Sequence, residues 1–198
     1  MGRRVTLLQR WQALGGQDDV GRELLARYAE PHRHYHDRQH LTEVLTALDL
    51  LGASNTARLA AWFHDAVYDP RRGDNEDRSA SLAVELLGKH LPTEQVADVA
   101  RLVRLTAAHD PAAGDADGAA LCDADLAILG AHPTRYGQYA TAVRAEYAHV
   151  PAADFARGRA AILRDLLNRE VLYRTLIARS RWEQAARANV SRELDRWG

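Results

Sequence analysis

Residues 41–52 have the sequence LTEVLTALDLLG, and this stretch decides the fold class. Its apolar residues Leu41, Val44, Leu45 and Leu48 recur at intervals of three and four, a spacing that gathers them on one face of an α-helix. Gly52 is suited to end that helix, because glycine readily adopts the left-handed conformation that often follows a last turn. The stretch therefore predicts an amphipathic helix with one buried face.

The same spacing recurs along most of the chain, and almost no segment alternates between apolar and polar residues as a half-buried strand would. We expect further helices, one capped by Asn55, one capped by Asn75 or Asp74, one opened by Pro92-Thr93 and one by Pro133-Thr134, with two or three more between residues 153 and 197. Only short turns separate these segments. The sequence thus predicts an all-α fold in which residues 1–198 form one compact multi-helix domain.

The composition excludes several classes of protein. Lys and Arg number 26 and Asp and Glu number 27, so there is no strong field for a polyanion and we expect no specific nucleic-acid binding. Apolar runs such as residues 59–63 are far shorter than the roughly 18 residues of a membrane span, so we expect no membrane insertion. The single cysteine, Cys122, cannot form an internal disulfide, which favours a cytoplasmic location.

Histidines and acids are grouped where apolar residues would bury them. His36 and His40 lie four residues apart, and would share a face if that segment were helical. His64 and Asp65 directly follow two large apolar residues, and burying a carboxylate there is costly unless a cation or strong donors meet it. The apolar stretch at 121–126 contains two further acids, Asp123 and Asp125. A metal ion would satisfy these groups together.

The ligand types indicate the chemistry. Two imidazoles and two carboxylates suit a divalent ion such as Mn²⁺, Fe²⁺, Co²⁺, Ni²⁺, Zn²⁺ or Mg²⁺. Four protein ligands on a six-coordinate ion leave positions for water and for a substrate phosphate oxygen, so the ion can polarise a phosphoryl group and lower the pKa of the water. We expect one such site, and a second metal is left open.

The ordered set His40, His64-Asp65 and Asp125 resembles the H…HD…D signature of the HD superfamily. Flanking stretches around these residues, and others as far as residue 189, are similar to its subgroup of small bacterial metal-dependent phosphohydrolases. The resemblance implies a helical HD domain whose metal centre is built from about residues 36–125, with helices of 133–197 packed on it. It implies His40, His64, Asp65 and Asp125 as the metal ligands, with Asp123 as the rival for the last position.

Catalytic roles follow from the same resemblance. The segment Tyr35-His36-Asp37…His40 is similar to a phosphodiesterase pattern in which the first histidine protonates the leaving oxygen, so His36 is a candidate general acid or, alternatively, only a neighbour of the ligands. Asp65 is expected to take part in catalysis as well as in metal binding. Glu76 is a candidate for acid–base work, although it equally suits the start of a helix through the helix dipole.

Three residues are candidates for substrate binding, namely Asn75, His109 and Arg144. His109 ends an apolar segment and could face the site, either toward substrate or toward a second metal, whereas His90 suits the end of a helix. Arg144 could bind phosphate oxygens bidentately or form a salt bridge between helices.

The leading hypothesis is hydrolysis of a phosphate ester or anhydride in a nucleotide or small phosphometabolite, by a metal-activated water. One alternative is an HD-fold oxygenase with two irons, which would require His90 and His109 as additional ligands. Another is a binding module that has kept the fold without turnover. The expected partner is a phosphorylated small molecule, and a homodimer is left open.

Overall fold

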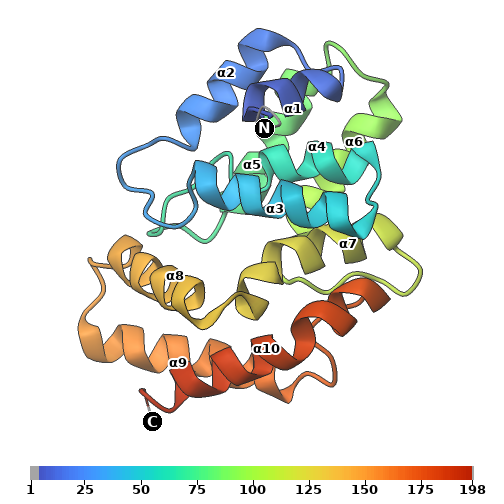
Figure 1. Cartoon of the computed structure of the whole chain (residues 1–198). Helices are drawn as coiled ribbons and strands as arrows, with labels where there is room; N and C mark the ends of the chain where they lie inside the picture. The colour runs from blue at the N-terminus through green and yellow to red at the C-terminus, as the bar shows by residue number, and fades with distance from the viewer. Residues whose placement is uncertain (1–4, 198) are drawn as a thin grey trace.

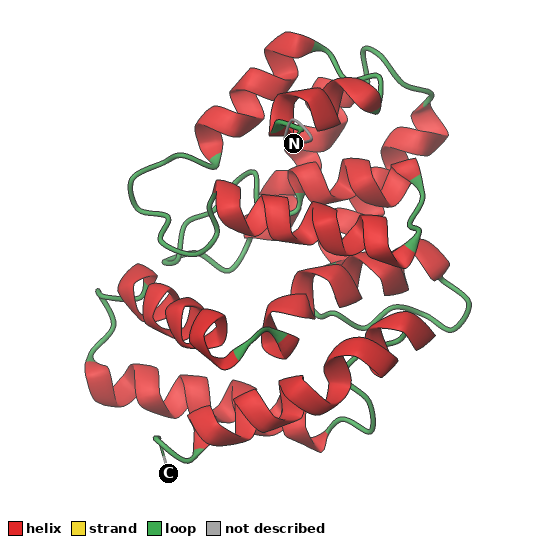
Figure 2. Cartoon of the chain, in the orientation of Figure 1, coloured by secondary structure: helices red, strands yellow, loops and turns green. Residues whose placement is uncertain are grey.

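Ten α-helices and one short 3₁₀-helix make up most of residues 5–197, the part of the chain that this computed structural model describes, and that part contains no β-strand (Figure 2). The helices are α1 (Leu7–Ala13), α2 (Asp18–Arg27), α3 (Arg38–Leu51), α4 (Asn55–Phe63), α5 (Asn75–Leu87), α6 (Thr93–Leu105), α7 (Ala116–Asp125), η1 (Leu126–Gly130), α8 (Pro133–Glu146), α9 (Ala152–Asn168) and α10 (Leu176–Leu194). The all-α fold expected from the apolar spacing is confirmed.

The helix that contains residues 41–51 begins at a side-chain cap. The Asp37 carboxylate accepts hydrogen bonds from the backbone N–H groups of Gln39 (2.8 Å) and His40 (3.1 Å), which satisfies two donors of the first turn. The helix ends at Gly52, whose φ of 66° is left-handed, as predicted. His36 therefore lies before the helix, and its ring meets that of His40 edge to face at 5.6 Å between centroids instead of stacking along one helical face.

Most of the predicted helix starts agree with the structure, which begins helices at Asn75, Thr93 and Pro133. The start of α4 differs in one detail. Ser54, and not Asn55, is the cap, because its hydroxyl accepts a hydrogen bond from the Ala57 N–H at 3.1 Å. Asn55 is the first residue of the helix.

The buried apolar residues form two clusters. The N-terminal cluster is made by α1–α7 and is centred on the fully buried Trp11, Trp62 and Phe63. The C-terminal cluster joins α8–α10 to η1 and to Tyr35. In Figure 1 the helices α8–α10 lie together below α1–α7, with η1 at the junction. Among the described residues, the two clusters share only two partly buried side chains, those of Leu51 and Trp182.

Two contacts hold α10 against the end of α7. A Cβ atom on Gly130 would lie 2.5 Å from the Cβ of Trp182, so only glycine permits this approach of η1 to α10. The buried carboxylate of Asp123 accepts hydrogen bonds from the backbone N–H groups of Arg174 (2.8 Å) and Thr175 (2.7 Å), just before α10 begins. Both contacts fix the position of α7, and hence of Asp125, relative to the C-terminal helices. Among the helices of residues 5–197, none combines the length and apolar character that a membrane span requires.

Candidate metal centre and adjoining pocket

Four side chains from three helix ends converge on one point. His40 lies in the first turn of α3, His64 and Asp65 directly follow α4, and Asp125 is the last residue of α7. The Nε2 atoms of His40 and His64 are 3.0 Å apart. The Oδ2 atom of Asp65 lies 3.2 Å from the first and 3.0 Å from the second, and the Oδ1 atom of Asp125 lies 3.1 Å and 3.5 Å from them. Both imidazoles are 1% exposed, so the cluster is almost closed to water.

The donor set fits a divalent ion. The Nδ1 atom of His64 donates to the Ala61 carbonyl at 2.7 Å, and since that carbonyl can only accept, Nε2 is left with a lone pair directed at the cluster. Two ligand atoms that bind one ion at about 2.1 Å and at right angles stand about 3.0 Å apart. The spacing of the two Nε2 atoms matches this value, so His40, His64 and Asp65 could hold a metal ion together. The Oδ1 atom of Asp125 lies outside this group of three but within 3.1 Å of Nε2 of His40.

The acids of the cluster are held in their charged form. Burial by itself would raise the pKa of Asp65 and of Asp125, but the charge of His64 and hydrogen bonds from the imidazoles hold both pKa values well below the usual range. Burial likewise lowers the pKa of His40, but its hydrogen bonds with Asp125 and Asp65 outweigh this and raise that pKa to about 9.

Asp125, and not Asp123, reaches the cluster. The carboxylate of Asp123 instead accepts hydrogen bonds from the backbone N–H groups of Arg174 and Thr175, away from His40 and His64. The two acids lie two residues apart near the end of α7, and therefore point in different directions.

A buried arginine holds the backbone around the cluster. Arg33 donates hydrogen bonds to the carbonyl oxygens of His36 (2.9 Å), Asp65 (2.7 Å) and Ala66 (3.2 Å), and its side chain has no solvent exposure. It thereby ties the loop before α3 to the loop after α4. The sequence alone did not assign this role to Arg33, because an arginine among histidines in a polar segment is usually an exposed residue.

A buried glutamate from α8 holds His36. One carboxylate oxygen of Glu146 accepts the backbone N–H groups of His34 (2.9 Å), Tyr35 (2.8 Å) and His36 (3.0 Å). The other oxygen lies 2.7 Å from Nδ1 of His36 and accepts the hydroxyl of Tyr68 at 2.8 Å. Burial raises the pKa of Glu146, but the hydrogen bond from His36 and those from the backbone lower it to about 2. The ionised carboxylate accepts the Nδ1 proton of His36 and leaves Nε2 as the free ring nitrogen.

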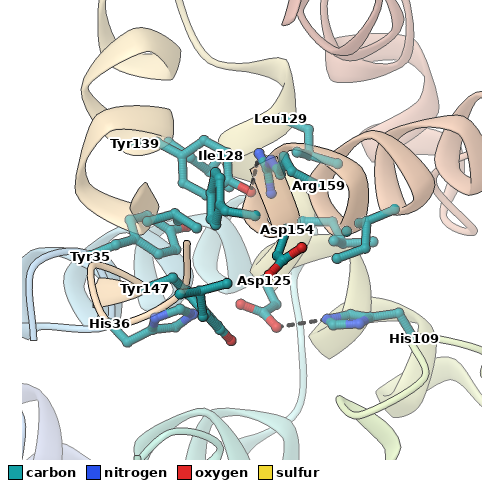
Figure 3. Close-up of a pocket in the computed structure, with 16 residues that line it drawn as sticks. Tyr35, His36, His109, Asp125, Ile128, Leu129, Tyr139, Tyr147, Asp154 and Arg159 are labelled. Atoms are coloured by element: carbon teal, nitrogen blue, oxygen red, sulfur yellow. Dashed lines mark hydrogen bonds and ion pairs between the residues drawn. The ribbon is translucent and has the colours of Figure 1, made fainter. Parts of the chain in front are cut away.

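His109 lies beside the cluster, as its position after an apolar helix suggested. Its Nε2 atom is 2.7 Å from Oδ2 of Asp125, the contact drawn as a dashed line in Figure 3. Its φ of 50° is left-handed, which is uncommon for a residue other than glycine and often marks a functional position. His90, in contrast, is exposed at the end of α5 and borders a separate small cavity beside Trp11.

A cavity of about 520 Å³ adjoins the cluster. His36, His109 and Asp125 line one end of it, and side chains of η1, α8 and α9 form the remaining walls. Figure 3 shows the three polar residues on one side, with Ile128, Leu129 and Tyr139 opposite. Of the four cluster residues only Asp125 lines the cavity, so a small molecule in it would meet the cluster at Asp125.

Three residues predicted to contact substrate or to act as acid or base neither belong to the cluster nor line the cavity: Asn75, Glu76 and Arg144. Asn75 closes the loop before α5, since its side chain accepts the Asp69 N–H and donates to the Asp69 carbonyl, both at 3.0 Å. Glu76 is partly exposed in the first turn of α5 and belongs neither to the cluster nor to the cavity lining.

Arg144 closes the turn between α8 and α9. Its guanidinium donates to the carbonyls of Tyr147 (2.6 Å) and Val150 (3.2 Å) and lies over the ring of Phe155. Since these three residues line the cavity, Arg144 shapes a wall without contacting its contents. No protein-family model, curated protein or solved structure matches this chain, so the converging donors and the adjoining cavity are the features that point to function.

Proposed function

We propose that this protein is a divalent-metal-dependent phosphohydrolase that cleaves a phosphate ester or anhydride of a small cytoplasmic metabolite. The observation that supports it most is the approach of one carboxylate oxygen each of Asp65 and Asp125 to within 3.0–3.5 Å of the paired Nε2 atoms of His40 and His64, beside a cavity that Asp125 lines. The order of these residues along the chain also supports membership of the HD superfamily.

An ion held by these four residues would withdraw charge from a phosphoryl oxygen and lower the pKa of a nearby water. His36 lines the cavity at the same end, so its Nε2 atom can deliver a proton to the leaving oxygen. In the proposed reaction the water would release one proton to solvent as its oxygen bonds to phosphorus, and the phosphorus–oxygen bond of the substrate would break. The leaving oxygen would take a proton from Nε2 of His36, and His36 would be protonated again from solvent. Glu146 keeps the His36 ring oriented throughout, because it holds Nδ1 from a buried position.

His109 supports the ligand Asp125. Its contact with Oδ2 leaves Oδ1 free to face the two imidazoles, and pairs of this kind orient ligands at many metal centres. Because His90 lies exposed beside a different cavity, the ligand set for two irons is incomplete around this cluster. A hydrolase with one ion is therefore the better proposal. A silent binding module would have no need for the complete ligand set.

The experiment measures metal content and turnover together. Protein loaded with Mn²⁺ or Co²⁺ is expected to hydrolyse p-nitrophenyl phosphate or its diester, and to lose this activity in EDTA. His64→Ala should lower metal content and activity by about a hundredfold or more, because it removes a ligand that is buried in the cluster. The matched control His90→Ala removes an exposed histidine and should change neither. Full metal content and turnover in His64→Ala would refute the proposal.

A further inference from the structure

The cavity beside the metal cluster has two chemically different ends. Its polar end consists of His36, His109 and Asp125, and is the end at which a phosphate group would meet the cluster (Figure 3). A volume of about 520 Å³ lies within the range of about 300–1,000 Å³ typical of small-molecule sites, so it has room for much more than a phosphate.

The rest of the lining is apolar and aromatic. It includes Tyr35, Ile128, Leu129, Tyr139, Val143 and Phe155. These side chains belong to the C-terminal cluster, so they are held by packing on their outer side and are partly uncovered only toward the cavity. An organic group that entered the cavity would exchange water for apolar surface, which is favourable in proportion to the area covered.

The lining offers no free positive charge to a second anionic group. Arg159 is the only lysine or arginine among the described residues of the lining, and it is 8% exposed. Its guanidinium pairs with the carboxylate of Glu193 at 2.8 and 3.0 Å and also donates to the hydroxyl of Tyr139 at 3.0 Å. Its charge is therefore already neutralised within the protein.

The other charged residue of the lining outside the polar end is an acid. The carboxylate of Asp154 lines the cavity and forms an exposed ion pair with Arg157, which does not line it, so this pair brings no free positive charge to the lining. Polyphosphates and bisphosphates normally require additional arginine or lysine side chains for each further phosphate. In this cavity such a compound would place its extra charges against apolar walls and near carboxylates, which is costly.

We propose that the substrate carries a single phosphate group, and that the rest of it is an uncharged, largely apolar alcohol which fills the cavity. This inference rests on the proposed hydrolase function and narrows it. It disfavours pyrophosphate, nucleoside triphosphates and bisphosphates, and it favours phosphate esters of alkyl or aromatic alcohols.

The first test uses n-alkyl phosphates, because methyl, butyl and octyl phosphate release alkoxides of similar basicity and differ mainly in apolar size. With Mn²⁺-loaded protein, kcat/KM should rise roughly fourfold for each methylene that enters the cavity, and by more than about a hundredfold from methyl to octyl phosphate. Pyrophosphate and ATP should be poorer substrates than butyl phosphate. Binding of the non-hydrolysable methylphosphonate and octylphosphonate, measured by calorimetry, should follow the same order.

Two glycines provide a matched pair of variants. Gly158 lines the cavity, and a Cβ atom added there meets no atom within 4 Å, so Gly158→Leu can occupy the cavity without displacing a neighbour. It should reduce the preference for octyl over methyl phosphate by about tenfold or more. The control Gly137→Leu also has open space at its Cβ atom and lies in a helix, but outside the cavity. It should leave the preference unchanged.

A second pair tests charge. Ile162 is exposed at the edge of the cavity, so Ile162→Lys should fold and place an ammonium group there. The ratio of kcat/KM for pyrophosphate to that for octyl phosphate should rise by about tenfold, while the control Ala161→Lys, on an exposed position outside the lining, should not change it.

The outcomes separate the two proposals. Metal-dependent hydrolysis with no dependence on alkyl length, or with a preference for pyrophosphate or ATP, would overturn the substrate class and leave the hydrolase intact. Absence of metal-dependent hydrolysis with every compound would overturn the hydrolase and, with it, the substrate class. A preference for octyl phosphate that Gly158→Leu abolishes and Gly137→Leu retains would support both.

Discussion

Two tyrosines of the C-terminal cluster differ in what their hydroxyl groups contact. The hydroxyl of Tyr35 is shielded from solvent and has no hydrogen-bond partner in the described part of the chain, whereas that of Tyr136 donates to Glu193 at 2.6 Å. Tyr35→Phe should therefore leave the free energy of unfolding unchanged or raise it slightly. Tyr136→Phe should lower it by about 1.5–3 kcal/mol, because a hydrogen bond to a charged group is lost. Urea unfolding of both variants measures the difference, and a large loss in Tyr35→Phe would show that its hydroxyl is paired.

Glu146 links acid stability to the position of His36. Burial raises the pKa of this carboxyl, but hydrogen bonds from His36 and the backbone lower it from 4.5 to about 2 in the folded state. The unfolded chain therefore takes up the proton first, and the contribution to stability is complete above about pH 4.5 and is lost as the pH falls toward 2. That contribution is on the order of 3 kcal/mol.

Glu146→Gln should remove most of this contribution, because the charge is lost and one of the two accepting oxygens becomes an NH2 group, which cannot accept a hydrogen bond from His36, Tyr68 or the backbone. Unfolding measured between pH 5 and 2 should then show a smaller slope. Turnover of alkyl phosphates, which need a proton on the leaving oxygen, should fall more than turnover of p-nitrophenyl phosphate. Glu85→Gln changes an exposed glutamate of α5 and should alter neither quantity. Equal losses with both substrates would assign Glu146 a purely structural role.

At the scale of the helices, the closest contact is between η1 and α10. Gly130→Ala would place a methyl group 2.5 Å from the Cβ of Trp182 and 3.0 Å from its backbone, so a helix must move. We expect a loss of about 1–3 kcal/mol in the free energy of unfolding. Gly137→Ala adds the same atom to open space within α8 and should raise stability by about 0.5–1 kcal/mol. Thermal or urea unfolding distinguishes the two, and equal stability of both variants would contradict the close contact.

The helices themselves were predictable because each carries an apolar face and a recognisable end. The segment 38–51 illustrates this, since its apolar spacing and Gly52 agree with the structure. What periodicity could not predict was the capping by Asp37, which excludes His36 from the helix and turns its ring toward Glu146. A helix cap depends on the hydrogen bonds of a single side chain, here that of Asp37, whereas the presence of a helix is indicated by the spacing of many residues.

Part of the cluster could be predicted for a related reason. A carboxylate beside large apolar residues is rare enough to require an explanation, and this signal marks Asp65 and the acids at 123 and 125. The inclusion of His40 and the choice of Asp125 over Asp123 came from the resemblance to the HD signature. The partners Arg33 and Glu146 carry no such local signal. Glu146 contacts His34, Tyr35 and His36, which lie more than a hundred positions earlier in the chain. Arg144, two residues before Glu146, instead donates to a carbonyl of the turn after α8.

For the molecule as a whole, metal binding should act as a stabilising ligand. An ion that binds only the folded state raises the free energy of unfolding by about 2.7 kcal/mol at a hundredfold excess over its dissociation constant. Mn²⁺ or Co²⁺ should thus raise the thermal midpoint of the wild type and of His90→Ala, but not that of His64→Ala. Burial lowers the pKa of both imidazoles, but the neighbouring carboxylates outweigh this and raise the pKa of His40 to about 9 and that of His64 well above its usual value. Both imidazoles must therefore lose a proton as an ion binds. Affinity should therefore increase between pH 7 and 9 by up to about a hundredfold per pH unit, and a pH-independent affinity measured by calorimetry would contradict this.

The residues that would hold the ion and those that would choose the substrate come from different halves of the chain. The four donors end α3, α4 and α7 or lie next to their ends, whereas most of the cavity wall comes from η1, α8 and α9. Substitutions within residues 126–162 other than Glu146, which holds His36, would therefore be expected to alter selectivity while the four donors keep their support from the N-terminal cluster. A library of variants confined to that later segment would be an efficient way to obtain new substrate specificities without changing the metal ligands.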